Sequence, residues 1–318
     1  PVTSVLTADG SVNLFNGAVE IATLLGAGTV NLNTTALTVG AGTFSGALNA
    51  DGSLVKVSGG LLTLSGNNGY TGVTTVNAGS LTLSGSLASS NLTIASGASF
   101  NAVSGSFLPT TSVLTADGSV NLFNGAVEVG KRVGAGKRDL NTTALTLGSG
   151  TFSGALNADG SLVKVSGGLL TLSGNNGYTG VTTVNAGSLM LSGSLASSTL
   201  TIATGAVFNA VSGSFFPTTS VLTADGSVNL FNGAVEIATL LGAGTVNLNT
   251  TALTVGAGTF SGALNADGSL VKVGGGLLTL SGNNGYTGVT TVNAGSLTLS
   301  GSLASSNLTI ASGAVFNA

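Results

Sequence analysis

The sequence contains no cysteine, no histidine and no tryptophan, and its one methionine is Met190. Without cysteine or histidine the chain has no thiol nucleophile, no imidazole base and no soft metal ligand. These absences predict a protein that is not an enzyme, with no catalytic residue, no cofactor and no metal site. The lack of cysteine also fits export into an oxidising compartment.

Charge is scarce as well. Only 5% of the 318 residues are charged, against about 25% in an ordinary globular domain. Low charge can indicate disorder, but disordered chains are poor in β-branched residues. This chain is rich in leucine and in the β-branched residues valine and threonine, and its mean hydropathy is +0.56. The composition therefore predicts a folded protein with a thin, regular core.

No targeting or membrane segment is evident. The chain opens at Pro1 without a basic leader region, and no apolar run approaches the ~18 residues that a membrane helix needs. We expect a mature product or an excerpt of a longer protein, with no membrane-spanning part in this segment.

The sequence repeats itself three times. The segment 4–10 returns as 112–118 and again as 220–226, at the same spacing of 108 positions each time. Internal repeats of this kind indicate one structural unit used several times. We expect repeat 1 at 1–108, repeat 2 at 109–216 and a shortened repeat 3 at 217–318, joined in one continuous solenoid.

Within a repeat, short apolar-polar alternations are separated by Asp-Gly, Asn-Gly, Gly-Gly and Ser-Gly turns. Alternation with period two predicts strands with one buried face, and these dipeptides are typical of turns. No segment shows a helical stripe, so the fold class is predicted to be all-β. The expected strands of repeat 1 include 11–14, 29–32, 36–39, 53–57, 61–64, 73–76, 80–83 and 91–94.

Two all-β architectures are compatible with a 108-residue unit. Separate immunoglobulin-like domains have this length, but they need larger aromatic anchors and linkers, and aromatic residues make up only 5% here. The close strand spacing favours a β-solenoid, in which serine, threonine and asparagine ladders satisfy one another and leucine and valine fill the interior. Coils of roughly 20 residues would give a rod on the order of 75 Å long.

Each repeat carries a specific motif, Leu-Thr-Leu-Ser-Gly-Asn-Asn-Gly-Tyr-Thr-Gly-Val-Thr-Thr-Val-Asn-Ala-Gly-Ser-Leu, which starts at Leu62, Leu170 and Leu278. It closely resembles the passenger-associated repeat (autotransporter-associated β-strand repeat) of bacterial autotransporters and giant repetitive surface proteins. The resemblance implies a right-handed parallel β-helix that is exported and located extracellularly or on the bacterial outer surface. It implies no catalytic residue.

The carboxylates do not form a cluster in sequence. A polysaccharide-cleaving β-helix needs a localised pair of acids, whereas Asp9 and Asp51 lie in Ala-Asp-Gly-Ser segments, where aspartate is a turn former. We expect a turn role for them. The acidic set recurs in every repeat: Asp9, Glu20, Asp51, Asp117, Glu128, Asp159, Asp225, Glu236 and Asp267.

Repeat 2 contains one irregularity, two Lys-Arg pairs formed by Lys131, Arg132, Lys137 and Arg138. Clustered basic residues can contact a polyanion such as lipopolysaccharide, a glycosaminoglycan or an acidic neighbouring subunit. The alternative is a solvated loop that has diverged from its two siblings. Nucleic-acid binding is not expected, because the net charge is −3 and no aromatic residue is interleaved for base stacking.

These features predict a structural stalk or adhesin segment with repeated identical faces. An alternative is a self-assembling extracellular filament or coat protein joined end to end, and a lesser one is a polysaccharide-active β-helix. Expected partners are further copies of the chain or host and cell-surface glycans.

Overall fold

The computed structural model describes residues 3–15, 17–103, 109, 111–123, 126–211, 217–231 and 233–318. Pro1 and the predicted repeat boundaries at 108 and 216 lie outside the described residues. The chain forms two compact units, Pro1–Gly160 and Ser161–Ala318. In the part that is described, every regular element is a β-strand, which confirms the predicted all-β class.

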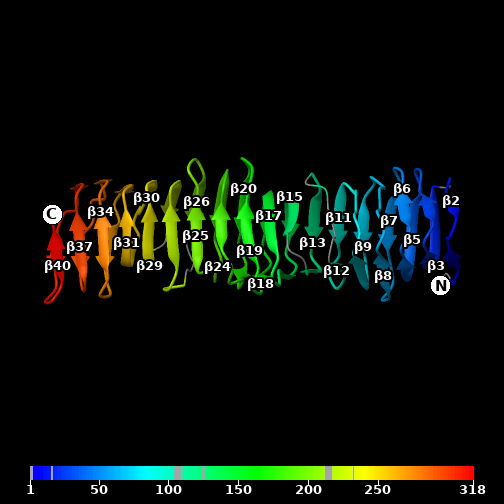
Figure 1. Cartoon of the computed structure of the whole chain (residues 1–318), viewed down its shortest axis with the longest axis horizontal. Helices are drawn as coiled ribbons and strands as arrows, with labels where there is room; N and C mark the ends of the chain where they lie inside the picture. The colour runs from blue at the N-terminus through cyan, green and yellow to red at the C-terminus, as the bar shows by residue number, and fades with distance from the viewer. Residues whose placement is uncertain are drawn as a thin grey trace. The chain divides into compact units, whose positions relative to one another are not determined.

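The first unit is a stack of short strands that lie side by side (Figure 1). Neighbouring coils pair in parallel and in register, as between the first and third strands and between the third and fifth. The strands are β1 (Val5–Thr7), β2 (Ser11–Asn13), β3 (Ala18–Gly26), β4 (Thr29–Asn31), β5 (Ala36–Phe44), β6 (Ala47–Asn49), β7 (Ser53–Lys56), β8 (Leu61–Leu64), β9 (Thr74–Val76), β10 (Ser80–Leu83), β11 (Asn91–Ile94), β12 (Ser99–Ala102), β13 (Val113–Ala116), β14 (Ser119–Leu122), β15 (Ala126–Gly134), β16 (Arg138–Asp139), β17 (Ala144–Phe152) and β18 (Leu156–Asn157).

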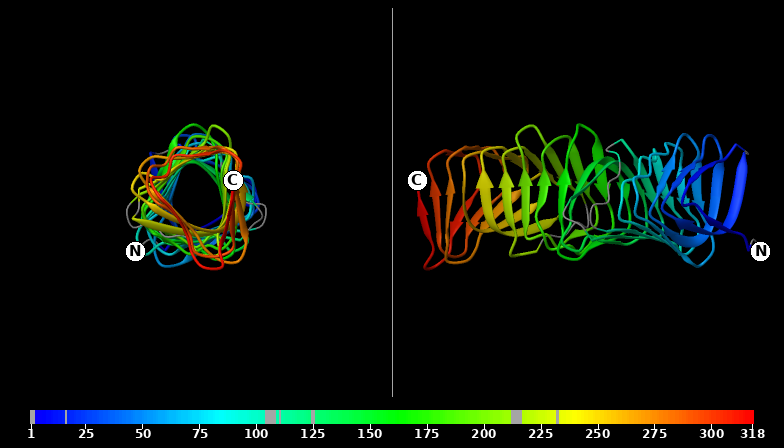
Figure 2. Two further views of the ribbon diagram at one scale, coloured as in Figure 1. Left: turned by 90° about the vertical axis from the view of Figure 1, so that its left-hand side faces the viewer. Right: turned by 45° about the vertical axis from the view of Figure 1, so that its right-hand side comes forward.

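The second unit has the same construction, and its coils enclose the interior on all sides (Figure 2). Its strands are β19 (Ser161–Lys164), β20 (Leu169–Leu172), β21 (Asn175–Asn176), β22 (Thr182–Val184), β23 (Ser188–Leu191), β24 (Ser194–Leu195), β25 (Thr199–Ile202), β26 (Val207–Ala210), β27 (Val221–Ala224), β28 (Ser227–Leu230), β29 (Ala234–Gly242), β30 (Thr245–Asn247), β31 (Ala252–Phe260), β32 (Ala263–Asn265), β33 (Ser269–Lys272), β34 (Leu277–Leu280), β35 (Asn283–Asn284), β36 (Thr290–Val292), β37 (Ser296–Leu299), β38 (Ser302–Leu303), β39 (Leu308–Ile310) and β40 (Val315–Asn317).

Each unit is a parallel β-solenoid, as the sequence predicts. Side chains that hydrogen bond between adjacent coils are 18, 19 or 20 residues apart, close to the expected coil of roughly 20 residues. Side chains alternate along the strands, so that Leu81 and Leu83 of β10 are buried. Asparagines stack on the coils, where the amide of Asn31 donates to the side-chain oxygen of Asn13 at 2.7 Å.

The repeat does not contain a whole number of coils. Six steps along one ladder carry Leu6 through Leu24, Gly42, Leu62, Leu81 and Phe100 to Val120. Val120 is the repeat 2 counterpart of Val12, not of Leu6. The counterpart of Leu6 is Leu114, which pairs instead with Leu92 and Arg132 on another side of the coil. Equivalent residues of successive repeats therefore face different directions.

Strand β5 is longer than the predicted 36–39, because its glycines do not end it. Gly42 has a φ of +140°, and a Cβ there would lie 2.0 Å from the carbonyl oxygen of Leu24. Glycine is the residue that adopts such a φ without steric cost. Glycine within this strand thus permits close packing of two coils, where the sequence pattern indicates a turn.

Candidate functional site

The carboxylates of the Ala-Asp-Gly-Ser segments bind the neighbouring coil. The Oδ1 atom of Asp9 accepts a hydrogen bond from the amide N–H of Ala27 at 3.2 Å. The Oδ1 atom of Asp51 accepts one from the Thr71 hydroxyl at 2.9 Å. Both aspartates lie at bends outside the strands, which agrees with the turn role predicted for them. Glu20, in contrast, is exposed on β3.

The carboxylates do not gather into a cation site in the described residues. No group of three or more histidine, cysteine, aspartate and glutamate side chains is placed to hold a metal ion there. The same described part contains no helix that is both long and apolar enough to cross a membrane.

The motif tyrosine is part of the core. Tyr178 is completely buried, and its hydroxyl shares a hydrogen bond of 2.6 Å with Thr182 Oγ1. Tyr70 and Tyr286 make the same bond with Thr74 and Thr290. Burial raises the pKa of Tyr286 to about 12, because the phenolate loses its hydration. The motif therefore supplies core packing and a buried hydrogen bond within each coil that carries it.

We expect these tyrosines to make the solenoid unfold at alkaline pH. A phenol has a pKa of 10.0 when exposed and of about 12 at Tyr286 in the fold. The neutral form is favoured by the fold, so this stability is fully present below pH 10 and is lost as pH rises through about 12. Circular dichroism and tyrosinate absorbance should change together, and tyrosine ionisation before loss of strand signal would contradict this.

The motif is preceded by a buried lysine that sequence analysis does not single out. Lys56 Nζ donates to the carbonyl oxygens of Val57 at 2.7 Å, Ser58 at 2.8 Å and Ala78 at 3.1 Å. Lys164 and Lys272 repeat this arrangement. An ammonium that donates to three carbonyl groups of two coils is satisfied, so this lysine closes a turn and offers nothing to a ligand.

Three of the four basic residues of repeat 2 lie on strands, and Lys137 directly precedes one, which corrects the expectation of a solvated loop. Residues 131 and 132 belong to β15, and Arg138 begins β16. The side chains of Lys131 and Lys137 are exposed, whereas Arg132 and Arg138 are each only 1% exposed. Strand alternation places Lys131 and Arg132 on opposite sides of β15, and Lys137, just before β16, is exposed whereas Arg138 is buried.

The arginines occupy positions that are apolar in the sibling repeats. Leu24 and Leu240 correspond to Arg132, and both are completely buried. Val30 and Val246 correspond to Arg138 and are also completely buried. Two guanidinium groups have thus replaced two aliphatic side chains in the interior of repeat 2.

One aromatic ring is the main contact of these guanidinium groups. The Cζ atom of Arg132 lies 3.5 Å from the centroid of the Phe152 ring, and that of Arg138 lies 5.6 Å from it. Burial and repulsion by Arg138 lower the pKa of Arg132 well below its usual range. Burial lowers the pKa of Arg138 to about 9, and attraction by Asp117 opposes that shift. Repulsion and desolvation both disfavour this pair in the charged form.

The polyanion contact stays a prediction, and it now falls on the outward-facing Lys131 and Lys137. We expect K131T/K137T, which restores the threonines of repeats 1 and 3, to elute from immobilised heparin at slightly lower salt. The effect is small because an exposed ion pair contributes about 0.2–1 kcal/mol. R132L/R138V is the matched control and should elute unchanged. Identical elution of K131T/K137T and the parent chain would remove the contact.

Comparison with known families and proteins agrees with the motif. The passenger-associated-transport-repeat matches residues 54–86, 162–191 and 270–302. The chain is also 32% identical over 183 residues to the adhesin BmaC autotransporter of Brucella suis, an alignment that covers 56% of this chain and 5% of that protein. The chain thus spans a small fraction of the length of this relative. No solved structure matches it.

Proposed function

We propose that this chain, whose three repeats each carry a passenger-associated-transport repeat, is a non-catalytic segment of a bacterial surface passenger. It acts as a stalk or adhesive surface outside the cell. The autotransporter adhesin that shares 183 aligned residues with it supports this location and role.

The main support for this proposal is that the polar side chains bind the protein itself. The acids of the turns bind the next coil, as Asp225 Oδ1 does by accepting from the amide of Ala243 at 3.0 Å. Buried hydroxyls bind the backbone, as Ser89 Oγ does by donating to the Gly72 carbonyl at 2.7 Å. A glycoside-cleaving site needs two carboxylates facing one bond of the substrate. Polar groups engaged in holding coils together support a structural role.

Adhesion is proposed to use repeated apolar groups on the outside. The same phenylalanine is exposed in each repeat, at 80% for Phe15, 53% for Phe123 and 51% for Phe231. Single exposed apolar residues are common on proteins, but here a contact made by one repeat is available in all three. Aromatic side chains are enriched in protein contact surfaces, so glycans or further copies of the chain are suitable partners.

Light scattering and negative-stain microscopy over a concentration series test the stalk proposal. If the three repeats make one continuous solenoid, a stalk segment gives a monodisperse rod of the length estimated from strand spacing, on the order of 75 Å. Particles that lengthen with concentration would favour the end-to-end filament instead. Release of reducing ends from a panel of polysaccharides would overturn the non-catalytic role.

A bead assay tests the adhesive part separately. Beads coated with the chain should attach to host epithelial cells, and F15S/F123S/F231S should reduce attachment several-fold while leaving the circular dichroism unchanged. The matched control is T82S/T298S, which changes two threonines that lie on strands. Equal attachment of the parent chain and both variants would show that the phenylalanines do not make the contact, and only the stalk role would then remain.

A further inference from the structure

A small cavity lies in the interior of repeat 2. It is lined by Phe100, Leu114, Val120, Leu122, Val127, Val129, Leu145 and both inward-facing arginines, Arg132 and Arg138. Its volume is about 10 Å³, which is close to the space that one water-sized particle needs. The cavity is thus large enough for one water molecule or one single-atom ion, and too small for a larger ligand.

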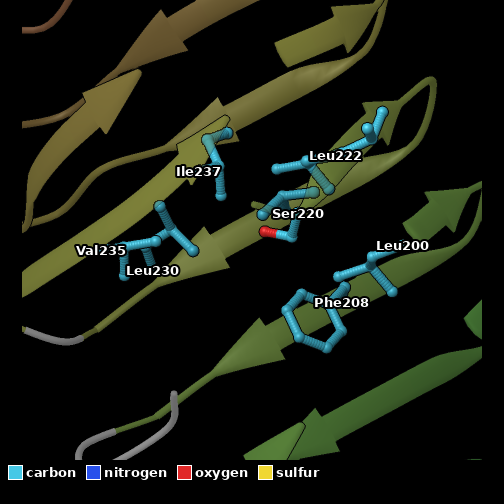
Figure 3. A pocket seen from close by; sticks show the side chains of 9 residues that line it. Leu200, Phe208, Ser220, Leu222, Leu230, Val235 and Ile237 are labelled. Atoms are coloured by element: carbon cyan, nitrogen blue, oxygen red, sulfur yellow. The ribbon is translucent and has the colours of Figure 1, made fainter. Parts of the chain in front are cut away.

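The second unit contains the same cavity without arginine. Its lining includes the counterparts of most of the apolar residues just named, among them Phe208, Leu222, Leu230, Val235 and Ile237. Figure 3 shows these side chains grouped around one space, with the Ser220 hydroxyl among them. The second unit therefore provides an uncharged control for the charged cavity of repeat 2.

The guanidinium groups of repeat 2 have almost no hydrogen-bond acceptors. Arg132 Nε, Nη1 and Nη2 and Arg138 Nε and Nη1 are buried without a partner. The remaining nitrogen, Arg138 Nη2, donates to the Ala116 carbonyl oxygen at 3.5 Å. Buried polar groups are nearly always hydrogen bonded to protein or to ordered water. These five nitrogens therefore indicate a site for an acceptor that the protein itself does not supply.

The acceptor has to be negatively charged. Arginine keeps its charge in proteins, and the burial that lowers the pKa of both arginines makes two such charges strongly unfavourable unless an opposite charge accompanies them. A water molecule would accept hydrogen bonds but would leave the charge uncompensated. Asp117, whose charge acts on Arg138, has an exposed side chain that binds the amide of Ala135 at 3.2 Å instead.

We propose that the interior cavity of repeat 2 binds one small monovalent anion, such as chloride, between Arg132 and Arg138. The stacking of Arg132 on Phe152 holds one guanidinium in place. The apolar residues of the lining exclude water and make the attraction between the anion and the two cations strong. A single-atom ion fits the volume, whereas sulfate and phosphate do not.

Hydrogen exchange of the intact chain tests the site in solution. Chloride should replace gluconate at constant ionic strength, and exchange should be followed by peptide. When chloride exceeds its dissociation constant 100-fold, protection of β15 and β16 should rise by roughly 100-fold, because binding to the closed form opposes local opening. The equivalent strands β29 and β30 should not respond, which provides an internal control.

R132L/R138V completes the test. It gives repeat 2 the interior residues of its siblings, so it should fold and should lose the chloride response. A bromide-soaked crystal of the parent chain should show an anomalous peak between the two arginines, absent from the variant. The proposal is overturned if β15 and β16 of the parent chain ignore chloride, if the variant keeps the response, or if bromide does not enter the cavity.

Discussion

R132L/R138V is expected to stabilise repeat 2 by about 1–4 kcal/mol, the range seen when well-packed apolar residues replace buried ion groups. Repeats 1 and 3 already carry Leu and Val at these positions, and all four side chains are completely buried there. The surrounding coils are therefore shaped for them. Urea unfolding in gluconate, with hydrogen exchange of β15 and β16, gives the size and the location of the gain.

The reverse substitution in repeat 3, which introduces the two arginines, is expected to destabilise the protein. L240R/V246R buries two unpaired charges among residues that pack Leu240 and Val246, and we expect a loss of at least about 3–5 kcal/mol. K131T/K137T changes the exposed side chains directly before the two arginines and should stay within about 0.5 kcal/mol of the parent chain. A neutral or destabilising result for R132L/R138V in gluconate would show that the arginines contribute to the fold.

The same variants separate the stability argument from the anion site. An anion between Arg132 and Arg138 stabilises only the parent chain, so the gain from R132L/R138V should shrink as chloride is added. If the gain in stability did not depend on chloride, the packing explanation would stand and the proposed anion site would be contradicted.

The second large effect is expected at a stack of glycines where consecutive coils turn. A Cβ on Gly66 would lie 2.0 Å from the carbonyl oxygen of Gly46, and a Cβ on Gly85 would lie 2.0 Å from that of Gly66. Overpacking against side chains costs about 1–3 kcal/mol. Here the obstacle is backbone of the neighbouring coil, which cannot rotate away. We therefore expect Gly85→Ala to cost about 3 kcal/mol or more.

Urea unfolding of Gly85→Ala and Gly59→Ala provides the comparison. Gly59 lies in an exposed turn, where an added Cβ meets no atom within 4 Å. Gly59→Ala should therefore be almost neutral. Equal stability of the two variants would contradict this prediction. It would show that the coils at Gly85 can move apart at little cost in free energy.

Much of the fold could be predicted from alternation alone. The expected strands at 53–57, 61–64, 80–83 and 91–94 correspond to β7, β8, β10 and β11. The long strand β3 was outside the expectation, because Ala18–Gly26 is largely apolar and gives no clear alternation. Glycine-rich strands are missed for a similar reason: a glycine that permits close coil packing has the same sequence signal as one in a turn.

The two Lys-Arg pairs show where local pattern reading fails. Four basic residues in eight positions indicate a solvated surface, yet Arg132 and Arg138 point inward because strand geometry takes precedence over charge. Alignment of the repeats contains the missing signal, since the equivalent positions hold Leu24 and Val30. The hydrogen-bond deficit of the pair could not be predicted, because it depends on the distances between coils.

The length of the repeat determines where its surface groups point. One repeat of 108 residues is six residues shorter than the six coils that lead from Leu6 to Val120, and six residues separate Leu6 from Val12, which lies on the next side of the coil. The second unit shows the same offset, because the ladder that starts at Leu170 leads to Leu264, whereas its counterpart Leu278 pairs with Gly258. Within the first unit, equivalent groups of repeats 1 and 2 thus face different sides of the solenoid and do not form a stripe. Within that unit, a partner with a flat surface can contact a given group of one repeat but not its equivalent in the next, whereas partners that approach from different sides can each bind one of them.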